Sequence, residues 1–285
     1  MKKVSVILLA LSTVFIFSCE SDDKIVDEVV AGVTSSAILR TRNIEGNPYN
    51  AFVPESVFTV TVEEQDVEGG DLLQSAELFI SFTDNQDDPN DASKAEQLLA
   101  TYQASDFVNG SRGLPELTFT TTLQESADFL GLGTDYSGGD VFSYRFVLHL
   151  TDGTSWTNTN GNGNITGGSY FSSPYQYNVN VSCIPTGPVP GDYTLSMQDS
   201  YGDGWNGASI RVTVDGVATD YFIDDGSSGS ATITIPDTAT TAVFEFVSGD
   251  WDSEITYQLV APNGKEAIAD GPSPFVGELT LNICP

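Results

Sequence analysis

The sequence is poor in positive charge, in histidine and in cysteine. It has 10 Lys and Arg residues against 40 Asp and Glu residues, so its formal net charge at pH 7 is −30. This excess argues against nucleic acid or an anionic lipid surface as a partner, because their phosphate groups would be repelled. A solvated acidic surface that meets divalent cations fits the composition better.

A single histidine is too few for most hydrolytic or zinc sites. His149 shares the polar face of an alternating segment with Ser143 and Arg145. This scarcity excludes most catalytic triads and the zinc sites of usual spacing. Carboxylate pairs of the kind that glycoside hydrolases use stay open in a chain this acidic. We therefore predict that the protein is not an enzyme, with a glycan hydrolase as the least supported alternative.

Long apolar runs are also absent, apart from one near the N-terminus. Residues 4–17 carry no charge and follow Lys2 and Lys3, a pattern typical of a secretory signal peptide and too short for a spanning helix. The run ends at Ile16-Phe17-Ser18-Cys19, which resembles a bacterial lipobox. The acidic tract 20–23 is similar to that of outward-facing surface lipoproteins in Bacteroidota.

This resemblance implies that residues 1–18 are a lipoprotein signal peptide and that Cys19 is lipidated. It also implies an outer-membrane protein that is anchored by lipid and faces the cell exterior. Residues 19–32 are polar and acidic, and we expect them to form a flexible tether. Without residues 1–18, which contain Lys2 and Lys3 and no acid, the formal charge is −32.

The two other cysteines lie at either end of the C-terminal part of the chain. Cys183 begins a Pro- and Gly-rich linker, 183–190, and Cys284 is the penultimate residue. An exported protein can form disulfides, and this one would tie the start of the C-terminal unit to its end. Closing a loop of this size contributes about 4.7 kcal/mol in the chain-entropy model. The alternative is a pair of buried free thiols.

Alternation of apolar and polar residues with a period of two dominates the rest of the chain. It predicts half-buried strands between Gly/Asn/Asp turns at 57–62, 76–82, 142–150, 175–181, 193–197, 210–214, 221–223, 231–235, 244–246, 255–259 and 279–283. A capping-box spacing from Thr122 to Glu125 predicts a short helix after Thr122. Residues 94–103 fit either a helix or a strand, and we favour a strand. The fold class is therefore all-β, with an Ig-like β-sandwich over 33–182 and a jelly-roll-like β-sandwich over 191–285.

The sharpest local motif is the run Asp-Ser-Tyr-Gly-Asp-Gly-Trp-Asn-Gly at 199–207, between two predicted strands. Its glycines allow tight turns, and its acids and amide supply hard oxygen ligands of the kind calcium prefers. A second motif, 248–254, places two more acids around Trp251. If both loops lie at one end of the sandwich, they complete one calcium site. Its predicted ligands are Asp199, Asp203, Asn206, Asp250 and Asp252.

An alternative interpretation of the same residues needs no metal. Asp and Asn side chains cap neighbouring backbone groups as Asx turns, and Trp205 would pack over them as a lid. The spacing does not match the EF-hand pattern, which excludes that family.

Both motifs, within residues 191–283, resemble a module that recurs in secreted proteins of Bacteroidota and of some eukaryotic microbes. The resemblance implies an extracellular β-sandwich and no particular reaction. Segments of the N-terminal part resemble flavobacterial lipoproteins often found beside SusC/SusD-type nutrient importers, which implies an accessory role at such an importer. These segments are 104–107, 135–140, 150–153, 165–168 and 173–175.

An Asn/Gly-rich segment, 156–177, carries aromatic residues that offer a second candidate site. Trp156, Tyr170 and Phe171 would stack on sugar rings or grip a peptide if they were exposed; the alternative is that they fill the core at hairpin ends. The leading hypothesis is a non-enzymatic binding or accessory module with a glycan or peptide ligand. A structural or adhesive surface protein with a calcium-stiffened module is the alternative.

Overall fold

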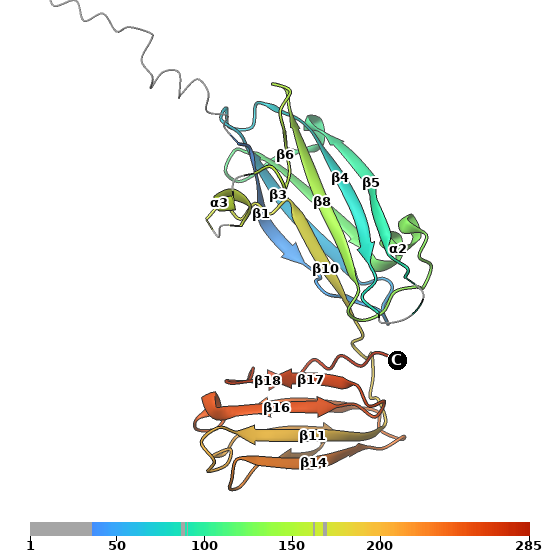
Figure 1. The fold of residues 1–285 in the computed structure, drawn as a ribbon, viewed down its shortest axis with the longest axis vertical. Helices are drawn as coiled ribbons and strands as arrows, with labels where there is room; N and C mark the ends of the chain where they lie inside the picture. The colour runs from blue at the N-terminus through green and yellow to red at the C-terminus, as the bar shows by residue number, and fades with distance from the viewer. Residues whose placement is uncertain (1–35, 87–88, 90, 162, 168–169) are drawn as a thin grey trace, which may run out of the picture. The chain divides into compact units, whose positions relative to one another are not determined.

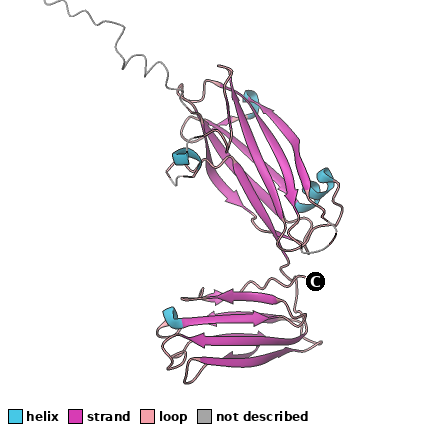
Figure 2. Cartoon of the chain, viewed as in Figure 1, coloured by secondary structure: helices cyan, strands magenta, loops and turns pink. Residues whose placement is uncertain are grey.

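The computed structural model describes residues 36–285, except 87–88, 90, 162 and 168–169. The predicted signal peptide, Cys19 and the acidic tether lie outside the described residues. Within those residues, no helix reaches the length and apolarity that crossing a membrane requires. Nearly all regular structure is β-strand, as Figure 2 shows, and two separate apolar cores divide it into two sandwiches. The predicted all-β fold class with two sandwiches is confirmed.

The N-terminal sandwich consists of two sheets (Figure 1). One has the strand order β1-β3-β7-β6, and the other has the order β2-β10-β8-β4-β5 with β9 paired to β8. Every pairing is antiparallel except the short parallel pair of β10 and β2. The strands are β1 (Ile38–Glu45), β2 (Tyr49–Asn50), β3 (Val57–Gln65), β4 (Leu73–Thr83), β5 (Lys94–Gln103), β6 (Val108–Asn109), β7 (Pro115–Thr122), β8 (Val141–Leu150), β9 (Ser155–Trp156) and β10 (Gln176–Ser182).

Strict alternation along β8 explains how the N-terminal core forms. Every second side chain from Phe142 to Leu150 is buried, while the residues between them are half-buried on the opposite face. Phe58 of β3 stacks on Tyr144 of β8 with 5.3 Å between ring centroids, so the two sheets meet through their aromatic residues. The predicted strands at 57–62, 76–82, 142–150 and 175–181 are confirmed in this sandwich.

Helical structure in the N-terminal sandwich is short. Helix α2 (Leu123–Leu130) begins at the predicted capping box: the Glu125 amide donates to Thr122 Oγ1, and the Thr122 amide donates to the Glu125 carboxylate. It ends at Gly131, whose φ of 66° closes the helix in the left-handed region. The other helical pieces are η1 (Ala104–Asp106) and α3 (Gly163–Thr166). The favoured strand at 94–103 is also confirmed, as β5.

The C-terminal sandwich has two four-stranded antiparallel sheets. Their strand orders are β14-β11-β16-β17 and β13-β12-β15-β18, and a 3₁₀ turn, η2 (Asp252–Glu254), precedes β16. The strands are β11 (Gly191–Asp199), β12 (Ser209–Val214), β13 (Val217–Tyr221), β14 (Ser228–Ile235), β15 (Ala242–Val247), β16 (Ile255–Val260), β17 (Glu266–Asp270) and β18 (Gly277–Glu278).

The predicted strand at 221–223 lies too far along the chain, because β13 ends at Tyr221, and the predicted strand at 279–283 is wrong. The segment after β18 is irregular, although Leu279 and Ile283 are buried as the alternation required. The Leu279 amide bonds to the Phe244 carbonyl of β15, whereas the Asn282 amide bonds to the Ala267 carbonyl of β17. The segment therefore passes from one sheet to the other, and it cannot keep a regular ladder with either.

The predicted disulfide joins Cys183 to Cys284, with 4.9 Å between their Cα atoms. Two hydrogen bonds flank it: the Ile283 amide donates to the Cys183 carbonyl, and the Cys183 amide donates to the Asn282 side chain. The bond ties the start of the C-terminal sandwich to its end. The alternative of two free thiols is wrong.

Candidate functional site

Four loops gather at one end of the C-terminal sandwich because alternate strands of an antiparallel sandwich finish at the same end. They follow β11, β13, β15 and β17, and they span 199–208, 222–227, 248–254 and 271–276. We call these four segments the loop end. Both sequence motifs lie within it, so the condition that the sequence set for a shared site is met.

Backbone hydrogen bonds connect the four loops in series. The Trp205 amide donates to the Ile223 carbonyl at 2.9 Å, and the Asp250 amide donates to the Asn206 carbonyl at 3.0 Å. The fourth loop joins through the Ser273 amide, which donates to the Asp252 carbonyl at 3.0 Å. The loop end is therefore one hydrogen-bonded unit.

The Asp199 side chain fixes the first loop by accepting hydrogen bonds from its backbone. Its side chain is almost fully buried, and Oδ2 accepts the amides of Gly202, Asp203 and Gly204 at 2.6, 2.9 and 3.2 Å. Gly204 has a φ of 88°, and a β-carbon there would lie 2.7 Å from the Ile223 carbonyl oxygen. The turn thus needs an acceptor at 199 and glycine at 204.

Trp205 belongs to the core. It is fully buried, its Nε1 donates to the Gln198 carbonyl at 3.1 Å, and its ring meets Phe246 edge-to-face. The turn geometry of the metal-free interpretation is therefore present in the loop. That geometry does not decide between the two interpretations, because a carboxylate that caps a turn still has an oxygen to offer a cation.

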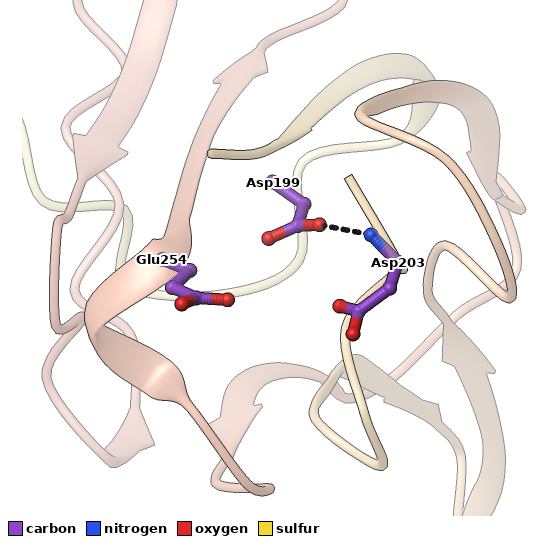
Figure 3. A group of neighbouring side chains, drawn as sticks. All are labelled: Asp199, Asp203 and Glu254. Carbon is purple, nitrogen blue, oxygen red and sulfur yellow. Dashed lines mark hydrogen bonds between the residues drawn. The ribbon is translucent and has the colours of Figure 1, made fainter. Parts of the chain in front are cut away.

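Three carboxylates from two loops converge at the loop end. Asp199, Asp203 and Glu254 each offer an oxygen, and these oxygens lie within 4.8 Å of one another (Figure 3). The pKa of Glu254 is raised by burial and then by the negative charges of Asp199 and Asp203. Among the ion pairs of the described residues, none involves these three carboxylates. Within the part of the chain that the structure describes, the cluster therefore has no ion-pair partner.

The other predicted ligands have structural contacts instead. Asn206 donates through Nδ2 to Asp203 Oδ1 at 2.8 Å and to the Gly204 carbonyl at 3.0 Å, so it orients Asp203. Asp252 accepts Ser248 Oγ at 2.6 Å and the Gly249 amide at 3.0 Å, which fastens its own loop.

The structure thus brings Asp199 and Asp203 together and leaves Asp250 and Asp252 out of the group. Sequence reasoning did not select Glu254, although this residue closes the second motif. Its position was a usable signal: it is the last residue before β16, at the mouth of the loop end.

A pocket of about 310 Å³ lies beside the carboxylates, lined by Tyr201, Asp203, Trp251 and Glu254. Its aromatic walls are exposed, Tyr201 by 76 % and Trp251 by 68 %. Trp251 also has a φ of 66°, in the left-handed region that a large side chain rarely adopts. The pocket therefore combines flat apolar walls with hydrogen-bond acceptors.

The three N-terminal candidate residues differ in exposure. Trp156 is 9 % exposed and belongs to the core, so no ligand can stack on its face there. Tyr170 is 85 % exposed, and Phe171 is half-buried and meets the Tyr170 ring edge-to-face at 4.9 Å. The structure leaves only Tyr170 widely accessible among them.

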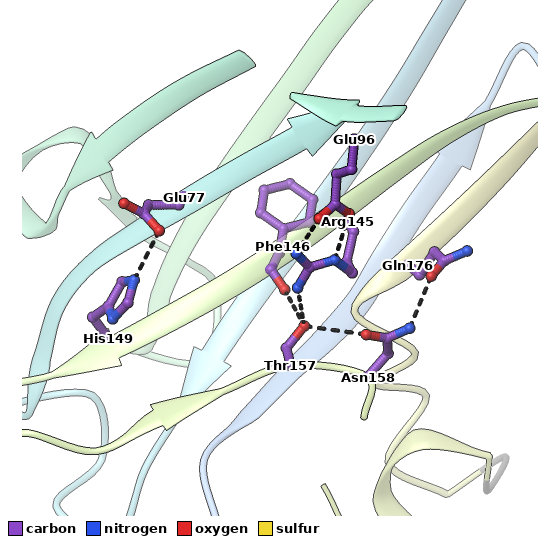
Figure 4. Close-up of polar contacts among 8 residues, drawn as sticks. All are labelled: Glu77, Glu96, Arg145, Phe146, His149, Thr157, Asn158 and Gln176. Carbon is purple, nitrogen blue, oxygen red and sulfur yellow. Dashed lines mark hydrogen bonds and ion pairs between the residues drawn. The ribbon is translucent and has the colours of Figure 1, made fainter. Parts of the chain in front are cut away.

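His149 lies on the outer face of β8, where the alternation predicted it. Its Nε2 is 3.2 Å from Glu77 Oε2, and on the same face Arg145 pairs with Glu96 through two 2.6 Å hydrogen bonds (Figure 4). Arg145 also donates to Thr157 and lies over the Phe79 ring. These contacts describe a polar sheet surface.

Comparisons with known proteins identify no family for this chain. No protein-family model matches the chain, and no curated protein matches it. Among solved structures, a bacterial adhesin from Mobiluncus mulieris containing intramolecular disulfide, isopeptide and ester bond cross-links is 10 % identical. The alignment covers 80 % of this chain and 78 % of the adhesin, with a TM-score of 0.23. A second crystal form of that adhesin is also 10 % identical, covering 80 % and 79 % with a TM-score of 0.19, and scores this low carry no argument about fold or function.

Proposed function

We propose that the chain is a non-enzymatic binding protein of the bacterial cell surface and that its binding site is the loop end. The observation that carries this proposal is the meeting of Asp199, Asp203 and Glu254 beside the exposed rings of Tyr201 and Trp251. Exposed apolar rings are costly in water, like charges held close together repel one another, and sites that combine the two features are typically binding sites.

Calcium is the cation that we propose for the cluster. Carboxylates held this close repel one another, and a cation between them removes the repulsion. Calcium takes about six to eight hard oxygen ligands in a flexible arrangement, which suits side chains on two loops. Asp199, Asp203 and Glu254 would each supply one or two of these oxygens, and calcium would hold the first and third loop of the loop end together.

Thermal unfolding with millimolar calcium and with a chelator tests this assignment. Calcium should raise the unfolding temperature of the wild-type chain, because an ion that binds only the folded state stabilises it. The Asp203→Ala variant should show no such difference, while Asp237→Asn, at an exposed turn outside the loop end, should behave as wild type. Equal unfolding temperatures of the wild-type chain in the two conditions would end the calcium proposal.

For the location, we propose lipidation at Cys19 and an outward-facing position on the outer membrane, as an accessory to a SusC/SusD-type importer. The lipobox, the acidic tract that follows it and the resemblances of the N-terminal segments support this. Protease added to intact cells should digest the wild-type protein, and a Cys19→Ala variant should be lost from the surface. Equal amounts of the wild-type protein and the Cys19→Ala variant at the surface would contradict lipid anchoring at Cys19.

A structural or adhesive surface protein is the second candidate, and the Cys183–Cys284 disulfide favours it. A bond that closes both ends of a sandwich resists unfolding under load, which an adhesive protein requires. Co-purification with a barrel importer from solubilised membranes would favour the accessory role. Loss of cell adhesion on deletion, without any importer in the pull-down, would favour the adhesive role.

A further inference from the structure

Exposed aromatic side chains of the C-terminal sandwich are confined to the loop end. Four rings are exposed, one on each loop: Tyr201, Phe222, Trp251 and Phe275. The other aromatic residues between 184 and 285 are buried or half-buried. Random exposure would distribute such rings over both ends and both faces, so their gathering on four connected loops indicates a surface for a ligand.

Trp251 is presented by a backbone that the neighbouring loops hold in place. Its left-handed φ of 66° is unfavourable for a residue with a β-carbon. The Asp250 amide bonds to the Asn206 carbonyl before it, and the Glu254 amide bonds to the Trp251 carbonyl after it. A strained and exposed tryptophan that is fixed on both sides is a feature of binding sites, where such strain persists because the surrounding structure enforces it.

Two carboxylates supply most of the hydrogen-bond acceptors in the pocket beside Trp251, and the Tyr201 hydroxyl adds a group that can donate or accept. The side chains of Asp203 and Glu254 line it, and within the described residues only Asn206 donates to either of them, at Asp203 Oδ1. Carboxylates accept hydrogen bonds and donate none, so donors for the remaining oxygens must come from the ligand or from solvent. A ligand with several donors and a flat apolar face therefore fits this pocket.

A sugar ring meets both requirements. Its axial C–H groups form a flat apolar face that packs on an aromatic ring, and its hydroxyl groups donate hydrogen bonds to carboxylates. The pocket, at about 310 Å³, is large enough for one ring, and both Tyr201 and Trp251 line it. The excess of negative charge on the chain disfavours uronic acids and sulfated sugars.

We propose that this pocket binds one pyranose unit of a neutral polysaccharide, with Tyr201 and Trp251 as stacking walls and Asp203 and Glu254 as acceptors for its hydroxyl groups. The inference rests on the proposed binding role of the loop end and names its ligand class. It does not require calcium, although a calcium ion on the same carboxylates would leave positions open for sugar oxygens.

Affinity electrophoresis of the purified chain tests the proposal, in gels that contain starch, mannan, laminarin or xylan, each run with calcium and with chelator. At least one polymer should retard the wild-type chain in at least one condition. Trp251→Ala and Tyr201→Ala should each weaken the apparent affinity by about tenfold or more, as central aromatic contacts do. Phe129→Ala is the matched control, because Phe129 is an exposed aromatic residue on α2, outside the loop end.

Retardation that disappears with Trp251→Ala and survives Phe129→Ala supports the proposal in either metal condition. Full mobility in all four polymers, or equal retardation of wild-type chain and Trp251→Ala, overturns it. Binding of oligolysine instead of these polymers, lost at high salt, also overturns it and assigns the pocket to cationic groups. The calcium melting experiment and the surface protease experiment have independent readouts, so failure here leaves the proposed function separately testable.

Discussion

At the scale of single residues, one buried carboxylate fixes the shape of the loop end. Asp199 accepts three backbone amides through one oxygen, and each bond joins a charged acceptor to a neutral donor. A neutral amide at this position would keep the shape of the side chain and lose the charge.

Asp199→Asn should therefore lower the free energy of unfolding of the C-terminal sandwich by about 2 to 3 kcal/mol, measured by urea denaturation in chelator. Chelator is needed because calcium would add a second effect of the same substitution. The control is Asp192→Asn, on the exposed side of the same strand, where Asp192 accepts only the Thr234 hydroxyl. A loss below about 0.5 kcal/mol for Asp199→Asn would show that its hydrogen bonds do not organise the loop.

Glu64 is a second buried acid, in the N-terminal sandwich. Both of its carboxyl oxygens are buried without a hydrogen-bond partner in the described residues, and burial, followed by the charge of Asp66, raises its pKa from 4.5 to about 8. Between these two pH values the folded chain keeps a proton that the unfolded chain releases. The stability of this sandwich should therefore fall as pH rises from 4.5 to about 8, by at most about 1.4 kcal/mol per pH unit.

Glu64→Gln removes the titrating group and keeps its shape. We expect the variant to gain stability over the wild-type chain as pH rises from 5 to 8, because the wild-type chain alone has a proton to lose. Denaturation of the full chain at several pH values, followed through the N-terminal transition, measures this. Parallel stability curves for the two proteins would show that Glu64 does not titrate in the folded state over this range.

The sequence predicted the strand that holds this acid but not its surroundings. Alternation through Phe58, Val60 and Val62 extends to position 64, where a glutamate would ordinarily mark the end of burial. The neighbouring Glu63 points to the other face and is still fully buried, because Arg40, only 2.6 Å away, pairs with it and covers it. Periodicity predicts on which face of the sheet a side chain lies. Whether a side chain of another strand then buries it depends on contacts between residues that are distant in sequence.

At the scale of elements, strands were predictable and the contacts between loops were not. The alternation located β3, β4, β8 and β10, and the capping box located α2, since both signals depend on neighbours in sequence. The motif at 199–207 was recognisable as a tight loop between two strands. Glu254 was not selected from the second motif, because only the fold shows that Asp252 turns back onto Ser248 and that Glu254 faces Asp199.

Close packing between the first and third loop gives a prediction at this scale. A β-carbon on Gly249 would collide with the backbone of residues 206–208, and backbone cannot move aside as a flexible side chain can. Gly249→Ala should therefore lower the free energy of unfolding by about 2 kcal/mol or more. Gly187→Ala, which has open space around its added methyl group, is the control and should stay within about 0.5 kcal/mol of the wild-type chain. Similar stability of the two variants would mean that the loops are not locked together.

At the scale of the whole molecule, the disulfide was predictable from the positions of its cysteines, and the structure places their Cα atoms 4.9 Å apart. A double Cys183→Ser, Cys284→Ser variant should lose about 2 to 5 kcal/mol of stability in its C-terminal transition, because the bond restricts the unfolded chain over a separation of 101 residues. Reduction of the wild-type chain should give the same loss, measured by thermal unfolding with and without reductant. No change in either case would show that the terminal segment is held by its other contacts.

Calcium at the loop end is the central part of the proposed function. Isothermal titration of the metal-free chain with calcium tests this claim most directly. We expect one calcium per chain with a dissociation constant of about 10⁻⁴ to 10⁻³ M, as extracellular modules show. Glu254→Gln should weaken binding at least tenfold, while Glu266→Gln, exposed and away from the loop end, should bind as wild type does. Binding that is absent from the wild-type chain, or that is unchanged in Glu254→Gln, would contradict the assignment of Asp199, Asp203 and Glu254 as a calcium site.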